Sequence, residues 1–512
     1  MTAPFPLSLK EQAIWVTALG LSLALAAAAA IPSLQALGTA AVLVSVLLAV
    51  SRLELPALVT VFLVSVNLVH LLKRVIFLIG PQPQSVYVGI QLFPTLILAA
   101  VCACAFRRRR SLPLPLSAKL LIVFLAVSLG VTLPAAQNGP PDAMLAAIHQ
   151  QLLPFLLFFV GLSLTLDQFA SAGRTIAILA VVSSVYGIVQ LMTGPTLVDR
   201  QWAYETYSYS IHGGKVLNYL EGVSREFRAY SYYADPLTWG LYLVAGFTGS
   251  TVAWKLSRLS RRSWLLASAL ITAGLFASMT RTCWAAYVGT LGVYLLLKIR
   301  RLWKPWALFT AAMGLFAVAV VGGTFLYREV FLARRLPIVA NPIVARYITV
   351  GTMEARISAW DGLIEAAVRK PFGYGVTPYV RKRSEAPESE RPLFSHNFLV
   401  ELVLNAGIPG AALFLLFYLQ WLREGIGALW KTTGANGQKA LLWILAFSVG
   451  SLFSGYFNGL NFMTYEFFLI LGAMSGYANG LKRRPRGFCR VDPAPLPGTP
   501  PRWVAAPAGG GR

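Results

Sequence analysis

Charged side chains are scarce in this chain of 512 residues. Asp, Glu, Lys and Arg together make up 12% of it, whereas 56% of the residues are hydrophobic and the mean hydropathy is +0.63. Soluble proteins are about 25% charged. The composition therefore excludes an ordinary soluble protein and predicts an integral membrane protein, in which one bundle of spanning helices forms a single unit.

Motifs for nucleotide and metal chemistry are also missing. The sequence has no P-loop, no H-E-x-x-H and no D-x-D. The acidic pair that comes nearest to a D-x-D motif is Glu388 with Glu390. The 4 cysteines show neither metal-binding nor redox spacing. We therefore expect no cofactor and no metal, and a reaction that ATP does not drive.

Long apolar runs are abundant. A spanning helix needs roughly 17–25 residues, and runs of about this length predict an all-α polytopic membrane protein with about 12–14 transmembrane helices. Because the first run is full length, we expect no cleavable signal peptide. The runs lie near residues 13–31, 34–50, 55–72, 87–106, 118–134, 151–166, 175–192, 237–254, 264–279, 281–298, 305–326, 396–420, 440–456 and 460–478.

The basic residues gather in short links on one side of the predicted bundle. This asymmetry predicts that side to be cytoplasmic, and it accounts for the net charge of +24 without nucleic acid as a partner. Lys73 and Arg74 fall on the opposite side and violate the pattern. The clusters lie at 107–110, 255–262, 298–304 and 482–486.

Two long loops fall on the side opposite the basic links, which we expect to be periplasmic. The first is rich in Tyr, and the second contains helical spacing of apolar residues between Glu354 and Lys370. Loops of this length usually carry function. The predicted organisation is N-terminal helices (1–192), a periplasmic Tyr-rich loop (193–236), central helices (237–326), a large periplasmic loop with an amphipathic helix (327–395), C-terminal helices (396–480) and a disordered cytoplasmic tail (481–512).

Arginine, tyrosine and one histidine offer chemistry on the loop side. His396 is one of only 4 histidines and lies where the second loop meets an apolar run. Guanidinium groups bind phosphate in a bidentate fork, and tyrosines present flat faces and hydroxyls to sugars. Asn397 either orients the imidazole or caps the helix that begins there, and we favour capping. The other candidates for substrate contact are Arg225, Arg228, Tyr230, Arg281, Arg356 and Trp360.

Four ordered segments together resemble the superfamily of O-antigen ligases and polymerases, which are bacterial membrane glycosyltransferases. They run from Arg225 through Asp235-Pro236 to Leu243, from Thr280 to Ala286, from Arg356 through Trp360 to Pro371-Phe372-Gly373-Tyr374-Gly375, and from Ser395 to Gly410. One departure is Thr282, where the superfamily usually has a small residue after the arginine. The N-terminal helices match only as generic spans.

The resemblance implies a fold of the membrane glycosyltransferase C class and a periplasmic active site without a metal. It implies a glycan donor on undecaprenyl diphosphate, with Arg281 and Arg356 at the diphosphate and His396 as the essential histidine. The acceptor would be a glycan or lipid A core, in O-antigen or exopolysaccharide biosynthesis at the inner membrane. We predict an inverting, metal-independent transfer.

Three alternatives stay open on the sequence. Ligase and polymerase share the donor and differ in the acceptor, and a protein O-glycosyltransferase would differ in the acceptor as well. A lipid-linked oligosaccharide flippase would share the arginines and the helix count. However, transporters often show internal repeats and charges near the midplane of the membrane. We find no repeat, and the candidate residues cluster at one face, which favours an enzyme.

Overall fold

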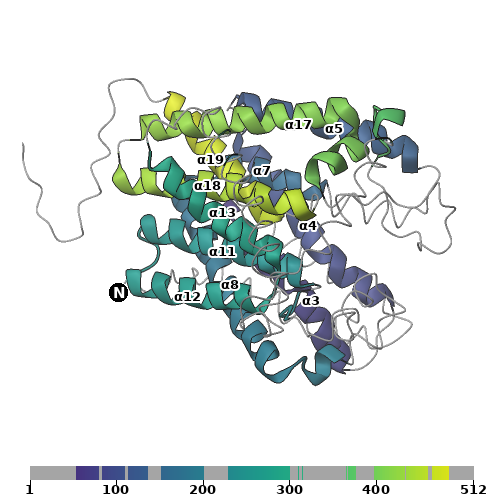
Figure 1. Ribbon diagram of the computed structural model, residues 1–512, viewed down its shortest axis with the longest axis vertical. Helices are drawn as coiled ribbons and strands as arrows, with labels where there is room; N and C mark the ends of the chain where they lie inside the picture. Colours follow the sequence, from purple (N-terminus) through teal and green to yellow (C-terminus); the bar gives the residue numbers. More distant parts are fainter. Residues whose placement is uncertain are drawn as a thin grey trace, which may run out of the picture.

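A computed structural model describes residues 53–79, 84–109, 113–136, 152–200, 229–233, 235–299, 367–375, 397–432, 434–458 and 464–483, with single positions at 310, 314 and 365. Within these residues the secondary structure is helical and contains no strand, so the chain is an all-α polytopic membrane protein. Its elements are α3 (Leu55–Ile79), α4 (Gln84–Arg109), α5 (Leu116–Ala136), the 3-10 turn η2 (Leu153–Phe155), α7 (Leu156–Leu162), α8 (Leu166–Thr193), α11 (Pro236–Lys255), α12 (Arg261–Ala277), α13 (Arg281–Leu297), α17 (Phe398–Lys431), α18 (Ala435–Asn458) and α19 (Tyr465–Arg483) (Figure 1).

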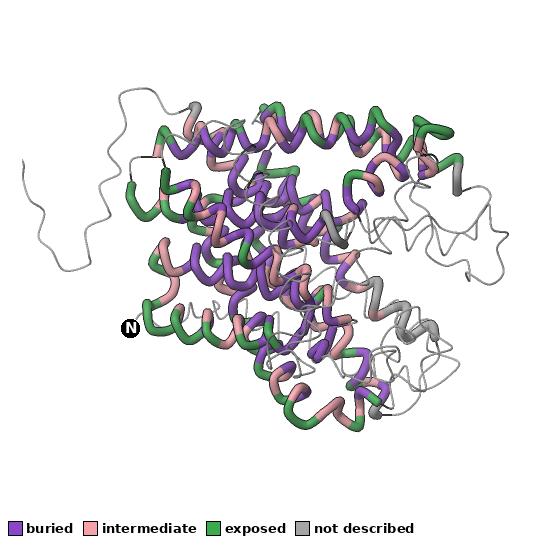
Figure 2. Tube along the Cα trace, viewed as in Figure 1, coloured by how far each residue is buried: buried purple, intermediate pink, exposed green. Residues whose placement is uncertain are grey.

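The helices form a bundle with α5 and α17 along one edge and α12 along the opposite edge (Figure 1). The buried residues concentrate in the helices between these edges, and exposed residues follow the outer helices (Figure 2). Five of the described helices are long and apolar enough to cross a membrane. On α8 the exposed apolar side chains recur at helical spacing, which is the pattern of a face turned toward lipid. They are Ile178, Val182, Val185, Val189 and Met192.

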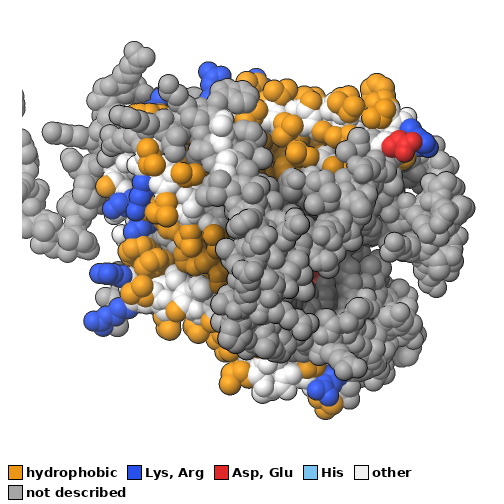
Figure 3. All heavy atoms as spheres, in the orientation of Figure 1, with side chains coloured by type: hydrophobic (Ala, Val, Ile, Leu, Met, Phe, Trp, Pro, Cys, Tyr) orange, Lys and Arg blue, Asp and Glu red, His pale blue; other side chains and the backbone are white. Residues whose placement is uncertain are grey.

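Most basic side chains of the described helices lie at one end of the bundle, seen along the left edge of Figure 3. Here Arg108 lies 4.0 Å from Glu54, and Arg258 lies 3.9 Å from Asp167, so these pairs join helix ends that are far apart in the sequence. We call this the basic end and define it by Arg107, Arg108, Lys255, Arg258, Arg261, Lys298 and Lys431. The opposite end, which carries Arg281 and Asn397, is called the loop end.

Glycines bring the described helices into backbone contact, most closely in two pairs. A Cβ added to Gly450 of α18 would overlap the backbone of Thr290 on α13. A Cβ added to Gly472 of α19 would overlap the backbone of Phe158 on α7. Small residues at such crossings permit the close approach that van der Waals packing of membrane helices needs. These two pairs therefore form the most closely packed part of the bundle.

The predicted spans between 55 and 298 and from 396 onward correspond to helices, with two corrections. The span predicted at 151–166 is wrong as a single crossing, because the helical residues Leu153–Leu162 cover only about 15 Å. The span predicted at 175–192 begins at Leu166, because Thr165 and Gln168 form a capping box that starts α8 earlier. The predicted spans at 13–31 and 34–50, and nearly all of 305–326, lie outside the described residues.

Candidate active site

Arg281 lies at the first position of α13, directly after the tight turn from α12. Met279 in this turn has φ +47°, a backbone region that non-glycine residues rarely adopt. The Thr280 hydroxyl donates to the Ser278 carbonyl at 2.9 Å, which closes the turn. The half-buried Arg281 side chain is therefore attached at the N-terminus of α13. At a helix N-terminus, amide N–H groups and the helix dipole favour anions.

The start of α11 packs against this turn. Asp235 caps α11 by accepting a hydrogen bond from the Thr238 amide at 2.8 Å, and Pro236 occupies the first helical position. The Cys283 thiol donates to the Leu237 carbonyl at 3.5 Å across the two helices. Residues 235–243, which belong to the first segment that resembles the superfamily, thus lie beside the second such segment, residues 280–286. The contacting residues are more than 40 positions apart in the sequence.

A buried ion pair holds the chain that leads into α11. The Arg74 guanidinium donates to Asp199 at 2.6 Å, to the Ser231 carbonyl at 3.0 Å and to the Tyr233 carbonyl at 2.7 Å. It also lies over the ring of Tyr230, 5.2 Å from the ring centroid. Arg74 and Asp199 are 2% and 0% exposed, so both charges are removed from solvent. Arg74 therefore fixes residues 229–233 at the loop end of the bundle.

Asp199 is surrounded by further donors. Its second carboxylate oxygen accepts from the Gln190 amide and the Thr196 hydroxyl, both at 2.8 Å, and from the Tyr186 hydroxyl at 3.2 Å. Buried charges are tolerated when they are paired and hydrogen-bonded in this way. The network joins the end of α8 to α3 and to the segment before α11.

The tyrosines of residues 229–233 are part of the protein interior. Tyr230, Tyr232 and Tyr233 are all buried, and the Tyr233 hydroxyl donates to the Asn67 side chain at 2.7 Å. Burial raises the pKa of Tyr232 to about 12, so its hydroxyl stays protonated and donates to the Leu179 carbonyl at 3.3 Å. Tyr230 here packs under Arg74; the substrate contact assigned to it stays a prediction.

The span predicted at 396–420 corresponds to the first part of α17, which is kinked at Gly407. Gly407 has φ +73° and ψ 175°, a conformation that is essentially restricted to glycine. Pro409 has no N–H, so the Asn405 carbonyl has no intrahelical donor. The break divides α17 into a short arm, Phe398–Ala406, and a long arm that continues to Lys431.

Residues 371–375 supply the hydrogen bonds that this break removes. The Tyr374 amide donates to the Leu404 carbonyl at 2.6 Å, and the Gly375 amide donates to the Asn405 carbonyl at 3.1 Å. In return, the Ile408 amide donates to the Pro371 carbonyl at 2.8 Å. We call this exchange the 371–408 interlock. It joins the third and fourth of the segments that resemble the superfamily, and it gives partners to the Leu404 and Asn405 carbonyls and to the Ile408 amide.

Asn397 caps the short arm of α17, as the sequence interpretation favoured. Its side-chain oxygen accepts from the amides of Leu399 at 3.0 Å and Val400 at 3.4 Å, and Asn397 itself is buried. The cap fixes the start of the helix at Phe398, two residues after His396 in the chain. Its assignment to substrate binding stays a prediction.

Replacing Asn397 with alanine is expected to cost about 1 kcal/mol of stability, because two amides of the first turn lose their acceptor. Thermal unfolding of the full chain in detergent would measure this loss. Asn397→Asp keeps an acceptor and should recover most of it. If the alanine and aspartate variants unfold at the same lowered temperature, the capping role is refuted.

The other predicted site residues, namely Arg225, Arg228, Arg356, Trp360 and His396, lie outside the described residues. Arg74 and Asp199, which organise the loop end, were not among the site residues predicted from the sequence. The signal for Arg74 was nevertheless present, because a cation on the loop side opposed the charge asymmetry. Among the described residues, no three His, Cys, Asp or Glu side chains gather as a set of metal ligands.

Residues 266–415 match the family model for O-antigen ligase, and this range covers most of α12, all of α13 and the α17 break. No curated protein matches the sequence. The matched range includes Arg281, Arg356, His396 and Asn397, together with both sides of the 371–408 interlock. Residues 266–415 of this chain are therefore similar to the O-antigen ligase family, which supports the resemblance to the superfamily of O-antigen ligases and polymerases.

Proposed function

We propose that this protein is a membrane glycosyltransferase that moves a glycan from undecaprenyl diphosphate to an acceptor hydroxyl on the periplasmic side. The observation that carries the proposal is the O-antigen ligase match, which contains Arg281 and His396. The gathering of basic residues at the basic end supports the orientation, because such residues favour the cytoplasm. The loop end would then face the periplasm, as expected of a bacterial inner-membrane protein.

In the proposed reaction, the acceptor oxygen attacks the anomeric carbon and the bond from that carbon to the diphosphate oxygen breaks. The leaving diphosphate keeps the electron pair of this bond, and His396 takes or orients the proton of the acceptor hydroxyl. Direct displacement inverts the anomeric centre. The donor brings its own leaving group, so the transfer uses neither ATP nor a nucleotide sugar, and we propose that it is independent of metal.

The described residues support this scheme at two points. Arg281 combines a guanidinium group with the first amides of α13, and both favour the charge that builds on a diphosphate. The Asn397 cap and the 371–408 interlock fix the short arm of α17, which begins two residues after His396. We assign Arg356 to the same diphosphate, and Arg225, Arg228 and Trp360 to the bound glycan. Lipid A core or another glycan would serve as the acceptor.

Glycan transfer in proteoliposomes that contain a defined undecaprenyl diphosphate donor would test the proposal. His396→Ala is expected to lower the rate about 100-fold or more, as loss of a general base does. Arg281→Ala is expected to lower it about 100-fold, with partial recovery in Arg281→Lys, because one charge-stabilising donor is lost. Arg200→Ala removes an exposed arginine from the loop end and serves as the control.

Separate outcomes of this assay distinguish the alternatives. Activity of His396→Ala at the wild-type level would refute the role of His396, and complete dependence on a divalent metal would refute the metal-free scheme. Movement of the donor across the bilayer without a covalent product would identify a flippase. Parallel reactions with lipid A core, a lipid-linked repeat unit and a protein acceptor would distinguish ligase, polymerase and protein O-glycosyltransferase.

A further inference from the structure

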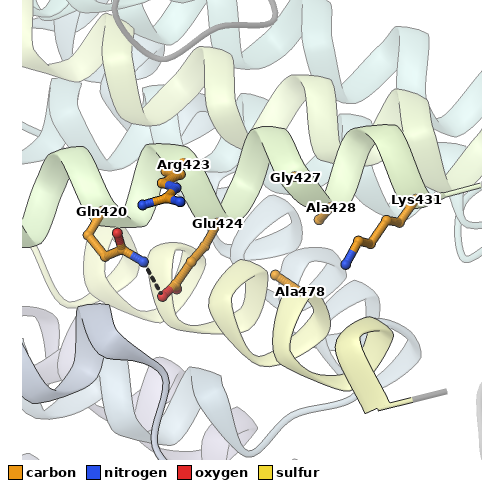
Figure 4. Close-up of a pocket in the computed structure, with 7 residues that line it drawn as sticks. All are labelled: Gln420, Arg423, Glu424, Gly427, Ala428, Lys431 and Ala478. Carbon is orange, nitrogen blue, oxygen red and sulfur yellow. Dashed lines mark hydrogen bonds between the residues drawn. The ribbon is translucent and has the colours of Figure 1, made fainter. Parts of the chain in front are cut away.

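A cavity of about 330 Å³ lies at the basic end, between the last turns of α17 and α19 (Figure 4). It is far from the loop end, so the proposed transfer does not use it. Its walls combine cationic, amide, carboxyl and small side chains. They are Gln420, Arg423, Glu424, Gly427, Ala428, Lys431 and Ala478.

Two of these side chains bring positive charge to the cavity. Arg423 and Lys431 are both exposed, and Lys431 extends from α17 toward the side of α19 that carries Ala478 (Figure 4). Within the described part of the chain, neither cation forms an ion pair with an acidic side chain. Their charge is therefore available to an anion that enters the cavity.

The carboxyl group in the wall is already engaged. One oxygen of Glu424 accepts from the Ser117 amide at 3.3 Å and from Gln420 at 3.2 Å, the bond drawn in Figure 4. The other oxygen accepts from the hydroxyls of Ser117 at 2.6 Å and Ser475 at 2.9 Å. Glu424 is only 4% exposed and binds α5, α17 and α19 together. Because these four donors already satisfy both oxygens of Glu424, this carboxylate does not pair with Arg423 or Lys431.

The position of the cavity fits a lipid better than a soluble anion. Leu415 and Leu416 are exposed earlier on α17, and Trp430 is exposed beside the cavity, 60% accessible. Tryptophan at a helix end is typical of the boundary between acyl chains and water. An acyl chain can lie along the apolar part of α17 while a headgroup occupies the cavity near Arg423 and Lys431. Basic pockets between membrane helices on the cytoplasmic side bind phosphate-bearing headgroups elsewhere.

We propose that this cavity binds the phosphate headgroup of an anionic lipid from the leaflet at the basic end. Guanidinium and ammonium groups both donate charge-assisted hydrogen bonds to phosphate oxygens. Gly427 lies in the wall, and a Cβ added there meets no heavy atom within 4 Å. A larger side chain at Gly427 therefore occupies cavity space without a clash against the protein.

The test uses the full chain in zwitterionic detergent, with dioctanoyl phosphatidylglycerol as the probe and the rise in unfolding temperature as the readout. Dioctanoyl phosphatidylcholine and inorganic phosphate are the comparison ligands. Phosphatidylglycerol is expected to stabilise the protein saturably, and the other two ligands are expected to have little effect. The double variant Arg423→Gln/Lys431→Gln should weaken the apparent affinity at least tenfold.

Two further variants make the result specific. Gly427→Leu keeps every charge and should also weaken binding at least tenfold, because it fills the cavity. Arg262→Gln/Lys439→Gln removes the same charge from exposed positions at the basic end and should change the affinity less than twofold. Equal protection by inorganic phosphate would overturn the lipid assignment. Equal loss in the Arg262/Lys439 control, or retained binding in both cavity variants, would overturn the site itself.

Discussion

Replacing Arg74 with alanine is expected to lower the free energy of unfolding by about 3–5 kcal/mol, because it leaves Asp199 charged and buried without its cation. Arg74 also donates to the carbonyls of Ser231 and Tyr233, so residues 229–233 lose their anchor at the same time. We therefore expect amide hydrogen exchange to rise in this segment and glycan transfer to fall. Denaturant unfolding in detergent, with exchange measured on the same sample, checks both effects.

Two comparisons isolate the buried pair. Arg74→Met with Asp199→Leu removes both charges and should recover much of the stability, since no uncompensated charge stays inside. Arg258→Ala breaks a pair whose partners are 34% and 75% exposed, and it should cost less than about 1 kcal/mol. If Arg74→Ala is no more destabilising than Arg258→Ala, the anchoring role of Arg74 is wrong.

Replacing Gly407 with alanine is expected to destabilise the 371–408 interlock by at least about 3 kcal/mol. A side chain at φ +73° and ψ 175° is strained by up to about 3 kcal/mol, and its Cβ would overlap the backbone of Phe372. The amides of Tyr374, Gly375 and Ile408 should then lose protection from hydrogen exchange. Because the interlock positions the arm that begins after His396, transfer should fall even where the rest of the bundle stays folded.

Gly427→Ala is the matched control, since it makes the same substitution on the same helix at a site with open space. It should leave exchange in the interlock unchanged and slightly raise stability, as alanine favours helix more than glycine does. Unaltered protection of the Tyr374 and Ile408 amides in Gly407→Ala would contradict the interpretation of the break.

Most helices could be predicted from the sequence, because the length of an apolar run and the residues that cap a helix start are features of neighbouring residues. The Asn397 cap is such a case, since an asparagine before an apolar run is a local signal. The early start of α8 was a local signal that was missed: Thr165 and Gln168 initiate the helix within a stretch that is not very apolar.

The site depends on contacts that no local pattern contains. Arg74 and Asp199 are 125 residues apart in the sequence, and only the packing of α3 beside the end of α8 brings them together. Gly407 and Pro409 are residues that favour a break in a helix. However, these two residues alone do not reveal that residues 371–375 complete the backbone hydrogen bonds of α17. The family resemblance identified four segments by their order along the chain. In the fold, the first segment contacts the second, and the third contacts the fourth.

The glycine crossings of α13 with α18 and of α7 with α19 have a mechanical consequence. Where backbones touch, one helix cannot slide along the other without collision, because no flexible side chain lies between them to yield. The two pairs therefore act as a stiff frame. For the proposed reaction, we therefore expect the displacements that would admit a long glycan and release the diphosphate carrier to be confined to the loop end, with Gly407 as a pivot, while the frame stays still.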